Sequence, residues 1–167
     1  VVIASVKRQK RFEGRTLREV AEMRGQPLLE ALLDLIVEEE AAVTATAHVL
    51  DEEDVRSVLR DAYTMGGTDG MPTLEGKPHP RTFGTYPRVL EHYVRRLGLF
   101  DLETAIHKMT GLPARKFGLE GRGVLQPGGI ADLVVLAPER VRDRSTYARP
   151  ARAPEGIDEV WVAGVPV

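Results

Sequence analysis

The sequence predicts the α/β fold class, and three observations support this. Strand-like and helix-like segments alternate over the first two thirds of the 167 residues. The strand-like runs are apolar throughout, as in strands covered on both faces of a sheet. The last third changes to short strands separated by glycine turns, which indicates antiparallel pairing. The alternation in the first part implies parallel strands joined by helical crossovers.

The N-terminal segment is predicted to form a strand followed by a helix. The run VVIASV at 1–6 is apolar and rich in β-branched residues, so it predicts a short buried strand. The charged run KRQKR at 7–11 is interpreted as a solvated loop, with a phosphate or carboxylate site as the alternative. Thr16 is followed three residues later by Glu19, which predicts a capped helix ending at Gly25.

The next segment is predicted to add a helix, a strand and a further helix. Pro27 begins the first of these helices at a position that proline tolerates. The apolar stripe of that helix consists of Leu28, Ala31, Leu32, Leu35 and Ile36. The run AAVTATAHV at 41–49 contains small and β-branched residues and predicts a buried strand. Asp51 is placed to cap the following helix.

The middle of the chain is predicted to contain one more strand and three helices. AYTMGGT at 62–68 is strand-like and ends at Asp69, where a turn-rich stretch begins. A helix is expected over 85–97, and Asp101 is expected to cap the next one. A short helix then ends at Gly118.

The last third is predicted to form a second domain of strands. ADLVVLAP predicts one strand, and GIDEVWVAGVPV predicts two more, at 160–163 and 166–167, about a glycine turn. We place a boundary near Gly118, which divides the chain into domains 1–118 and 119–167.

The composition argues against several classes of function. A formal net charge of −2 provides no basic field for nucleic acid. The absence of cysteine excludes disulfides and thiolate metal sites. No apolar run approaches the roughly 20 residues that span a bilayer, and no signal peptide opens the chain. We therefore expect no membrane partner and a cytoplasmic location. The strand-like start without Met predicts a piece of a longer protein.

The C-terminal third resembles the amidohydrolase superfamily. GRGVLQPGGIADLVVL at 121–136 and GIDEVWVAGVPV at 156–167 match the superfamily pattern RG-x-L-x-x-G-x-x-ADLVV-x-x followed by G-I-x-x-V-x-V-x-G-x-x-V. KMTGLPARKFGL resembles the helical segment that precedes this pattern. The resemblance implies strands of a small β-sandwich beside a TIM-type barrel.

The nearer resemblance is to the N-acyl-D-amino-acid deacylases, or D-aminoacylases. That branch pairs G-S-D-G with H-P-R-x-x-G-T-F-P-R-V-L, and this chain has GTDG at 67–70 and HPRTFGTYPRVL at 79–90. Thr68 and Tyr86 are mild departures from the pattern. EGRTLREVAEMRGQPLLEALLDLI and DRSTYARPARAPEGI extend the likeness over almost the whole chain.

This likeness implies a specific fold. The chain is expected to be the C-terminal part of a TIM-like (β/α)8 metal-dependent hydrolase barrel, followed by strands of a small β-sandwich domain. The run 62–68 would be the eighth barrel strand, so Asp69 would lie at its C-terminal end. Chemistry in such barrels occurs at that end of the strands.

The resemblance also implies roles for residues of one stretch. Asp69 is implied to contact the metal site and to act as the catalytic proton shuttle. Arg81 is implied to bind the substrate's α-carboxylate, which a guanidinium can bind in a bidentate manner. The alternative for Arg81 is a surface arginine in a long loop. His79 is interpreted as a loop-packing or substrate-rim residue, with metal ligation or acid–base chemistry as the alternative. The parent enzyme would hydrolyse the amide bond of N-acyl-D-amino acids to a carboxylate and a D-amino acid.

Zinc is the cofactor that the resemblance implies for the complete enzyme. Zinc lowers the pKa of a bound water to about 7 and polarises a carbonyl group. The family's H-x-H pair and its other ligands precede the region that this chain matches. No histidine pair here has H-x-H or H-E-x-x-H spacing. We therefore expect that this chain alone holds no zinc and is inactive by itself.

The other polar candidates are interpreted as structural. His48, at the end of a strand-like run, is expected to bond locally, with a position at the active-site end as the alternative. His92 and His107 lie on predicted helices and are expected to be structural or solvent-facing. Asp132 precedes a strand and is expected to accept hydrogen bonds from local backbone amides.

Two alternatives to the deacylase hypothesis stay open. The parent could hydrolyse a cyclic amide, as hydantoinases and dihydroorotases do, although the HPR-x-x-GT-x-PRVL run argues against this. The chain could instead be a non-catalytic binding or assembly module. The partners expected under the leading hypothesis are a small N-acyl amino acid and either the remaining part of the barrel or a second copy of the chain.

Overall fold

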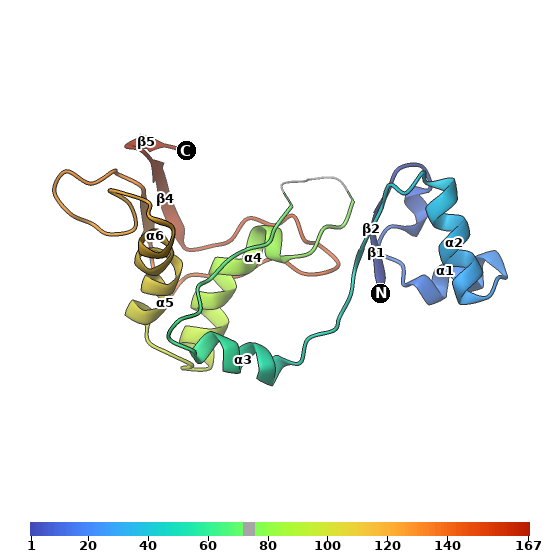
Figure 1. Cartoon of the computed structure of the whole chain (residues 1–167), viewed down its shortest axis with the longest axis horizontal. Coiled ribbons are helices and arrows are strands. Elements are labelled where there is room, and N and C mark those ends of the chain that lie inside the picture. Colours follow the sequence, from blue (N-terminus) through green and yellow to red (C-terminus); the bar gives the residue numbers. More distant parts are fainter. Residues whose placement is uncertain (72–75) are drawn as a thin grey trace. The chain divides into compact units, whose positions relative to one another are not determined.

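The computed structural model describes residues 1–71 and 76–167 (Figure 1). Residues 72–75, part of the predicted turn-rich stretch, lie outside the described residues. The chain divides by its internal contacts into two compact units. The first unit comprises Val1–Val49, Asp69–Phe83 and Ser145–Arg152, and the second comprises Leu50–Thr68, Gly84–Arg144 and Ala153–Val167. These units do not test the predicted domain boundary near Gly118, which stays a prediction.

The first unit contains a two-stranded sheet, and two helices lie in the connection between its strands. Strand β1 (Val2–Val6) pairs antiparallel with β2 (Val43–Thr46). The connection contains a 3₁₀ turn, η1 (Lys10–Phe12), and the helices α1 (Leu17–Arg24) and α2 (Leu28–Glu38). Both predicted strands and both predicted helices of this region are therefore present.

The direction of the two strands differs from the prediction. Strand–helix alternation predicts a parallel pair, and this is wrong for β1 and β2. A single helix between two strands returns the chain for parallel pairing, but here two helices lie between them and contact each other. Each helix reverses the direction of the chain, so β2 enters the sheet antiparallel to β1.

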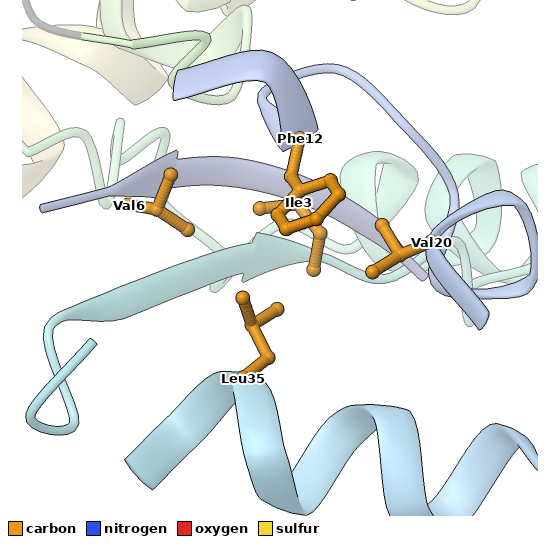
Figure 2. Packing of buried hydrophobic residues seen from close by; sticks show 5 residues of the cluster. All are labelled: Ile3, Val6, Phe12, Val20 and Leu35. Atoms are coloured by element: carbon orange, nitrogen blue, oxygen red, sulfur yellow. The ribbon is translucent and has the colours of Figure 1, made fainter. Parts of the chain in front are cut away.

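A small apolar core holds the first unit together. Figure 2 shows Ile3 and Val6 from β1, Phe12 from η1, Val20 from α1 and Leu35 from α2 gathered at one place. Each of these side chains is buried. The core therefore joins η1, α1 and α2 to the sheet.

The helix ends of the first unit follow from their sequence. The Thr16 hydroxyl accepts a hydrogen bond from the Glu19 N–H, and the Glu19 carboxylate accepts one from the Thr16 N–H, as the capping-box pattern predicts. Gly25 ends α1 in the left-handed conformation. Beyond α2, the buried Glu39 carboxylate accepts hydrogen bonds from the Arg8 and Gln9 N–H groups. The four cationic side chains of the run KRQKR are exposed, as expected of a loop. The backbone of the run is hydrogen-bonded to the Glu39 carboxylate.

The helices of the second unit lie close to their predicted positions. Asp51 caps α3 (Glu52–Arg60), and Asp101 caps α5 (Leu102–Met109). Helix α6 (Gly111–Phe117) ends at Gly118 in the left-handed conformation. All three helix ends were specified by local sequence signals.

One helix begins earlier than predicted. The helix expected over 85–97 starts four residues sooner, as α4 (Arg81–Arg88), and continues as the π-helix η2 (Val89–Arg96). Pro87 lies inside this helix and has no N–H to donate to the preceding turn. The helix widens into the π form directly after it.

The C-terminal strands form a three-stranded antiparallel sheet in the order β3-β4-β5. These strands are β3 (Leu133–Leu136), β4 (Ile157–Val162) and β5 (Val165–Pro166). Leu136 and Ile157 pack against a core of buried residues in the second unit: Val89, Leu90, Tyr93, Ala105 and Val141. The predicted strands of the last third are confirmed within a few residues, and so is the α/β fold class.

The predicted strand over 62–68 is not formed. The Gly66 N–H donates a hydrogen bond to the Lys108 carbonyl, and the Lys108 ammonium donates to the Thr64 carbonyl. A strand requires a neighbouring strand as partner, but these backbone groups are bonded to α5 instead. None of the helices within the described ranges combines the length and apolar character that crossing a membrane requires.

Candidate active site

A cavity of about 260 Å³ lies within the first unit. Residues of β1 and β2 line it, including Ser5 and Thr44, whose hydroxyls are hydrogen-bonded at 2.7 Å. Asp69, His79 and Arg81 line the same cavity. The structure thus brings together all three residues that the sequence predicts as site residues.

Asp69 stands on a strained turn with its side chain free to reach solvent. Its φ of 45° lies in the left-handed region, which Asp tolerates better than most non-glycine residues. Its side chain is 86% exposed. A Cβ added at the next residue, Gly70, would lie 2.9 Å from the Cα of Thr82. Gly70 therefore permits the close approach that brings Asp69 beside the start of α4.

Arg81 contacts Asp69 at two points. The Arg81 Nη2 lies 2.7 Å from the Asp69 Oδ2, and the Arg81 Nε donates a hydrogen bond to the Asp69 carbonyl at 3.0 Å. Arg81 is the first residue of α4, so it does not lie in a long loop. Its guanidinium is presented towards the cavity by a helix end that is anchored to the Asp69 turn.

His79 links Arg81 to a residue that is distant in sequence. The His79 Nδ1 accepts a hydrogen bond from the Arg81 backbone N–H at 3.0 Å. The His79 Nε2 lies 3.2 Å from the Tyr147 hydroxyl. Because Nδ1 acts as the acceptor, the neutral ring carries its proton on Nε2 and donates it to Tyr147. Burial, the Arg81 charge and His48 together lower the pKa of His79 below its ordinary value.

Tyr147 is the site residue that sequence reasoning missed. Its ring lies edge-on to His79, with 5.2 Å between centroids, and edge-on to His48, with 4.5 Å between centroids. It belongs to the quoted segment DRSTYARP, but no local pattern indicates that this segment lies beside the HPR motif. His48 follows the end of β2, and its ring packs against Tyr147.

The residues at this site do not by themselves fit a zinc ion. Within residues 1–71 and 76–167, no three His, Asp or Glu side chains form a group that could hold a metal. Catalytic zinc sites use three protein ligands. Asp69 would supply one carboxylate, and in this structure that carboxylate is paired with Arg81.

His92, His107 and Asp132 lie in the second unit and not at the cavity. His92 Nε2 is 3.7 Å from Glu52 Oε1, and His107 lies on α5 beside Gly111. Asp132 accepts a hydrogen bond from the Ala163 N–H at 2.8 Å, 31 residues away in sequence, and pairs with Arg122, so it is structural as predicted but the amide it bonds is not a local one. None of these three residues lines the cavity.

Comparison with known proteins defines the class to which this site belongs. Residues 4–167 match the model of the amidohydrolase family, so the chain belongs to that family. It is 49% identical over 156 residues to a D-aminoacylase from Alcaligenes xylosoxydans xylosoxydans, covering 93% of this chain and 31% of the relative. The chain therefore spans about a third of the length of that curated relative.

Solved structures agree in fold. A D-aminoacylase studied for its binuclear metal center has a TM-score of 0.90 and 44% identity, covering 99% of this chain and 34% of that one. An N-acyl-D-glutamate deacylase from Bordetella bronchiseptica, complexed with zinc and a phosphonate inhibitor, has a TM-score of 0.91 and 38% identity over the same shares. The predicted resemblance to the D-aminoacylase branch is confirmed.

The cyclic-amide alternative receives less support. A dihydroorotase from Endomicrobium trichonymphae is 49% identical, but over only 39 residues, which is 9% of that protein. The long matches are to D-aminoacylase and N-acyl-D-amino-acid deacylases, so the hypothesis of a cyclic-amide hydrolase is not favoured.

Proposed function

We propose that this chain forms part of a metal-dependent enzyme that hydrolyses N-acyl-D-amino acids to a carboxylate and a D-amino acid. The observation that carries the proposal is the pair formed by Asp69 and Arg81, 2.7 Å apart, which lines one cavity. One member can transfer protons, and the other can bind an anion. An N-acyl amino acid has a scissile amide, on which Asp69 can act, and an α-carboxylate, which Arg81 can bind.

Arg81 is assigned to the substrate's α-carboxylate. A guanidinium presents parallel N–H groups to a carboxylate, and such charge-assisted pairs are stronger than neutral hydrogen bonds. Arg81 already holds one carboxylate, that of Asp69. His79, which lines the same cavity, is assigned to the rim of the substrate site.

Asp69 is assigned the proton transfers. Its exposed carboxylate can take a proton from the attacking water and later hand one to the leaving amine. Amides have poor leaving groups, so protonation of the amine is needed for cleavage. We propose zinc as the metal of the complete protein, where it would supply a water of lowered pKa and a polarised carbonyl. Asp69 is the only contact with that metal that we assign to the described residues.

The partner of the first unit is proposed to be the remaining part of the barrel. Helix α2 exposes Leu29, Leu33 and Val37, and their exposed fractions are 65%, 53% and 76%. Three large apolar side chains on one short helix are usually covered by another surface. A second copy of the chain would be the other way to cover them.

The test is an assay on the complete reading frame that contains this segment. Amine release is measured from matched N-acetyl-D- and N-acetyl-L-amino acids with zinc present. We expect D-selective release that falls by a factor of about 100 or more in Asp69→Asn. Asp158→Asn removes an exposed carboxylate that does not line the cavity and should act like wild type. Zinc-loaded protein that releases amine from neither series would refute the proposal.

A further inference from the structure

We propose that His79 is a positioning residue: held by Tyr147, its neutral ring fixes the first turn of α4 and so aims the Arg81 guanidinium. This inference rests on the proposed function of Arg81. It assigns a role to two side chains on which the reaction scheme itself does not depend.

His79 contacts the start of helix α4. The first N–H groups of a helix have no partner within the helix and are usually capped by Ser, Thr, Asp or Asn. Here the His79 Nδ1 accepts the Arg81 N–H at 3.0 Å, so an imidazole takes the place of the cap. The backbone of Arg81 is therefore fixed by a ring two residues before it.

Tyr147 orients the His79 ring. An imidazole can cap the helix only if its ring is turned so that Nδ1 faces Arg81 and if Nδ1 carries no proton. The Tyr147 hydroxyl, 3.2 Å from Nε2, satisfies the opposite nitrogen. The edge-on packing of Tyr147 against His79 and His48 restricts the tilt of the ring. The Arg81 N–H, which can only donate, selects the tautomer, and Tyr147 restrains the orientation of the ring.

The position of this helix start determines where the Arg81 guanidinium lies. The Arg81 side chain leaves this capped turn and reaches Asp69 through Nε and Nη2. A shift of the first helical turn would move both nitrogens, and small displacements of substrate-positioning groups are costly. Loss of the cap should therefore weaken the binding of a carboxylate substrate and leave the proton transfers at Asp69 unchanged.

The variants separate this role from simple packing. His79→Asn keeps an acceptor close to the position of Nδ1, whereas His79→Leu removes it while preserving bulk. Tyr147→Phe keeps the aromatic ring and loses only the hydroxyl. Each is made in the complete protein, and thermal melting establishes that it is folded.

The kinetic readout is the selectivity between an N-acetyl-D-amino acid and its α-carboxamide. We expect His79→Leu to raise KM for the carboxylate substrate by about tenfold and to raise KM for the carboxamide much less. His79→Asn should recover most of the loss, and Tyr147→Phe should show a smaller rise. Unchanged selectivity in a folded His79→Leu protein would overturn the inference, even with the deacylase activity established.

A second readout is independent of activity. Histidine-selective ¹⁵N spectra of the complete wild-type protein report which ring nitrogen of His79 carries the proton, with His79→Asn identifying the signal. We expect Nε2 to be protonated and Nδ1 to be bare. A proton on Nδ1 would exclude the bond to the Arg81 N–H and overturn the inference. If no N-acyl-D-amino acid is hydrolysed, the proposed function fails, while this spectrum still decides whether His79 caps α4.

Discussion

The Glu91 carboxylate accepts a hydrogen bond from the Asp143 backbone N–H at 2.7 Å, across 52 residues of sequence. Its other oxygen lies 2.5 Å from the Arg96 Nη2 and 3.6 Å from the Arg95 Nη2. Glu91 is only 5% exposed, so both of its oxygens are satisfied inside the second unit. This one residue ties the π-helix η2 to the segment that leads towards β4.

Removal of this carboxylate should destabilise the second unit. Glu91→Ala leaves the half-buried Asp143 N–H without this acceptor and removes the counter-charge of Arg95, Arg96 and Arg142, which should lower the free energy of unfolding by about 2–4 kcal/mol. Urea unfolding of the complete protein measures the change. Glu120→Ala, at an exposed position, serves as the control. Equal stability of the two variants would show that the Glu91 contacts contribute nothing.

Acid should destabilise the protein by protonating the Glu91 carboxylate. Burial opposes ionisation of Glu91, but the Asp143 N–H and the Arg96 and Arg95 charges outweigh it and lower its pKa below the ordinary value. A folded-state pKa below the unfolded value stabilises the fold above the unfolded pKa of about 4.3, and this stability is lost as the pH falls through the folded pKa. The melting temperature should drop steeply below about pH 4.3 in wild type and less steeply in Glu91→Gln. Identical acid slopes would contradict this account.

Gly156 should tolerate no side chain. Its φ is 77°, and a Cβ there would lie 2.5 Å from both the Arg140 carbonyl carbon and the Val141 nitrogen. Gly128 has a similar φ of 78° but nothing within 4 Å. Both substitutions to Ala incur the left-handed penalty of about 1–2 kcal/mol, and only Gly156→Ala adds a backbone clash. Thermal melting should show a clearly greater loss for Gly156→Ala. A loss no greater than that of Gly128→Ala would mean that the backbone yields.

Lys108 should hold the segment that leads to Asp69. Its buried ammonium donates hydrogen bonds to the Asp61 carbonyl, to the Thr64 carbonyl at 3.0 Å and to the Thr64 hydroxyl at 3.2 Å. Lys108→Met removes all three donors, so we expect a stability loss of about 2–4 kcal/mol. Faster hydrogen exchange of the Gly66 amide should accompany it. The exposed Lys116→Met is the control, and equal exchange rates in the two variants would refute this role.

Sequence reasoning succeeded where the signal is local. Thr16, Asp51 and Asp101 each cap the helix that the sequence predicts, because a short polar side chain bonds N–H groups within three residues of itself. Gly25 and Gly118 end helices for an equally local reason, their left-handed φ. Asp69, His79 and Arg81 were found together because a single family pattern contains all three.

Sequence reasoning failed where distant segments decide the outcome. The run 62–68 has strand composition, but α5 takes its hydrogen bonds. The stretch before 85 contains proline and glycine and indicates a turn, yet α4 begins at Arg81, whose N–H donates to the His79 Nδ1. Gly84 lies within that helix, with no room for a side chain beside Asp143. Tyr147 could not be identified because only the fold brings it to His79.

We propose that Arg81 recognises the α-carboxylate of an acyl amino acid whose amide is cleaved with the help of Asp69. The most direct measurement is kcat/KM of the complete protein for an N-acetyl-D-amino acid relative to its α-carboxamide, in wild type and in Arg81→Met. We predict that wild type prefers the carboxylate by about 10- to 100-fold and that Arg81→Met abolishes the preference. A preference for the carboxylate that survives in Arg81→Met would show that Arg81 does not recognise it.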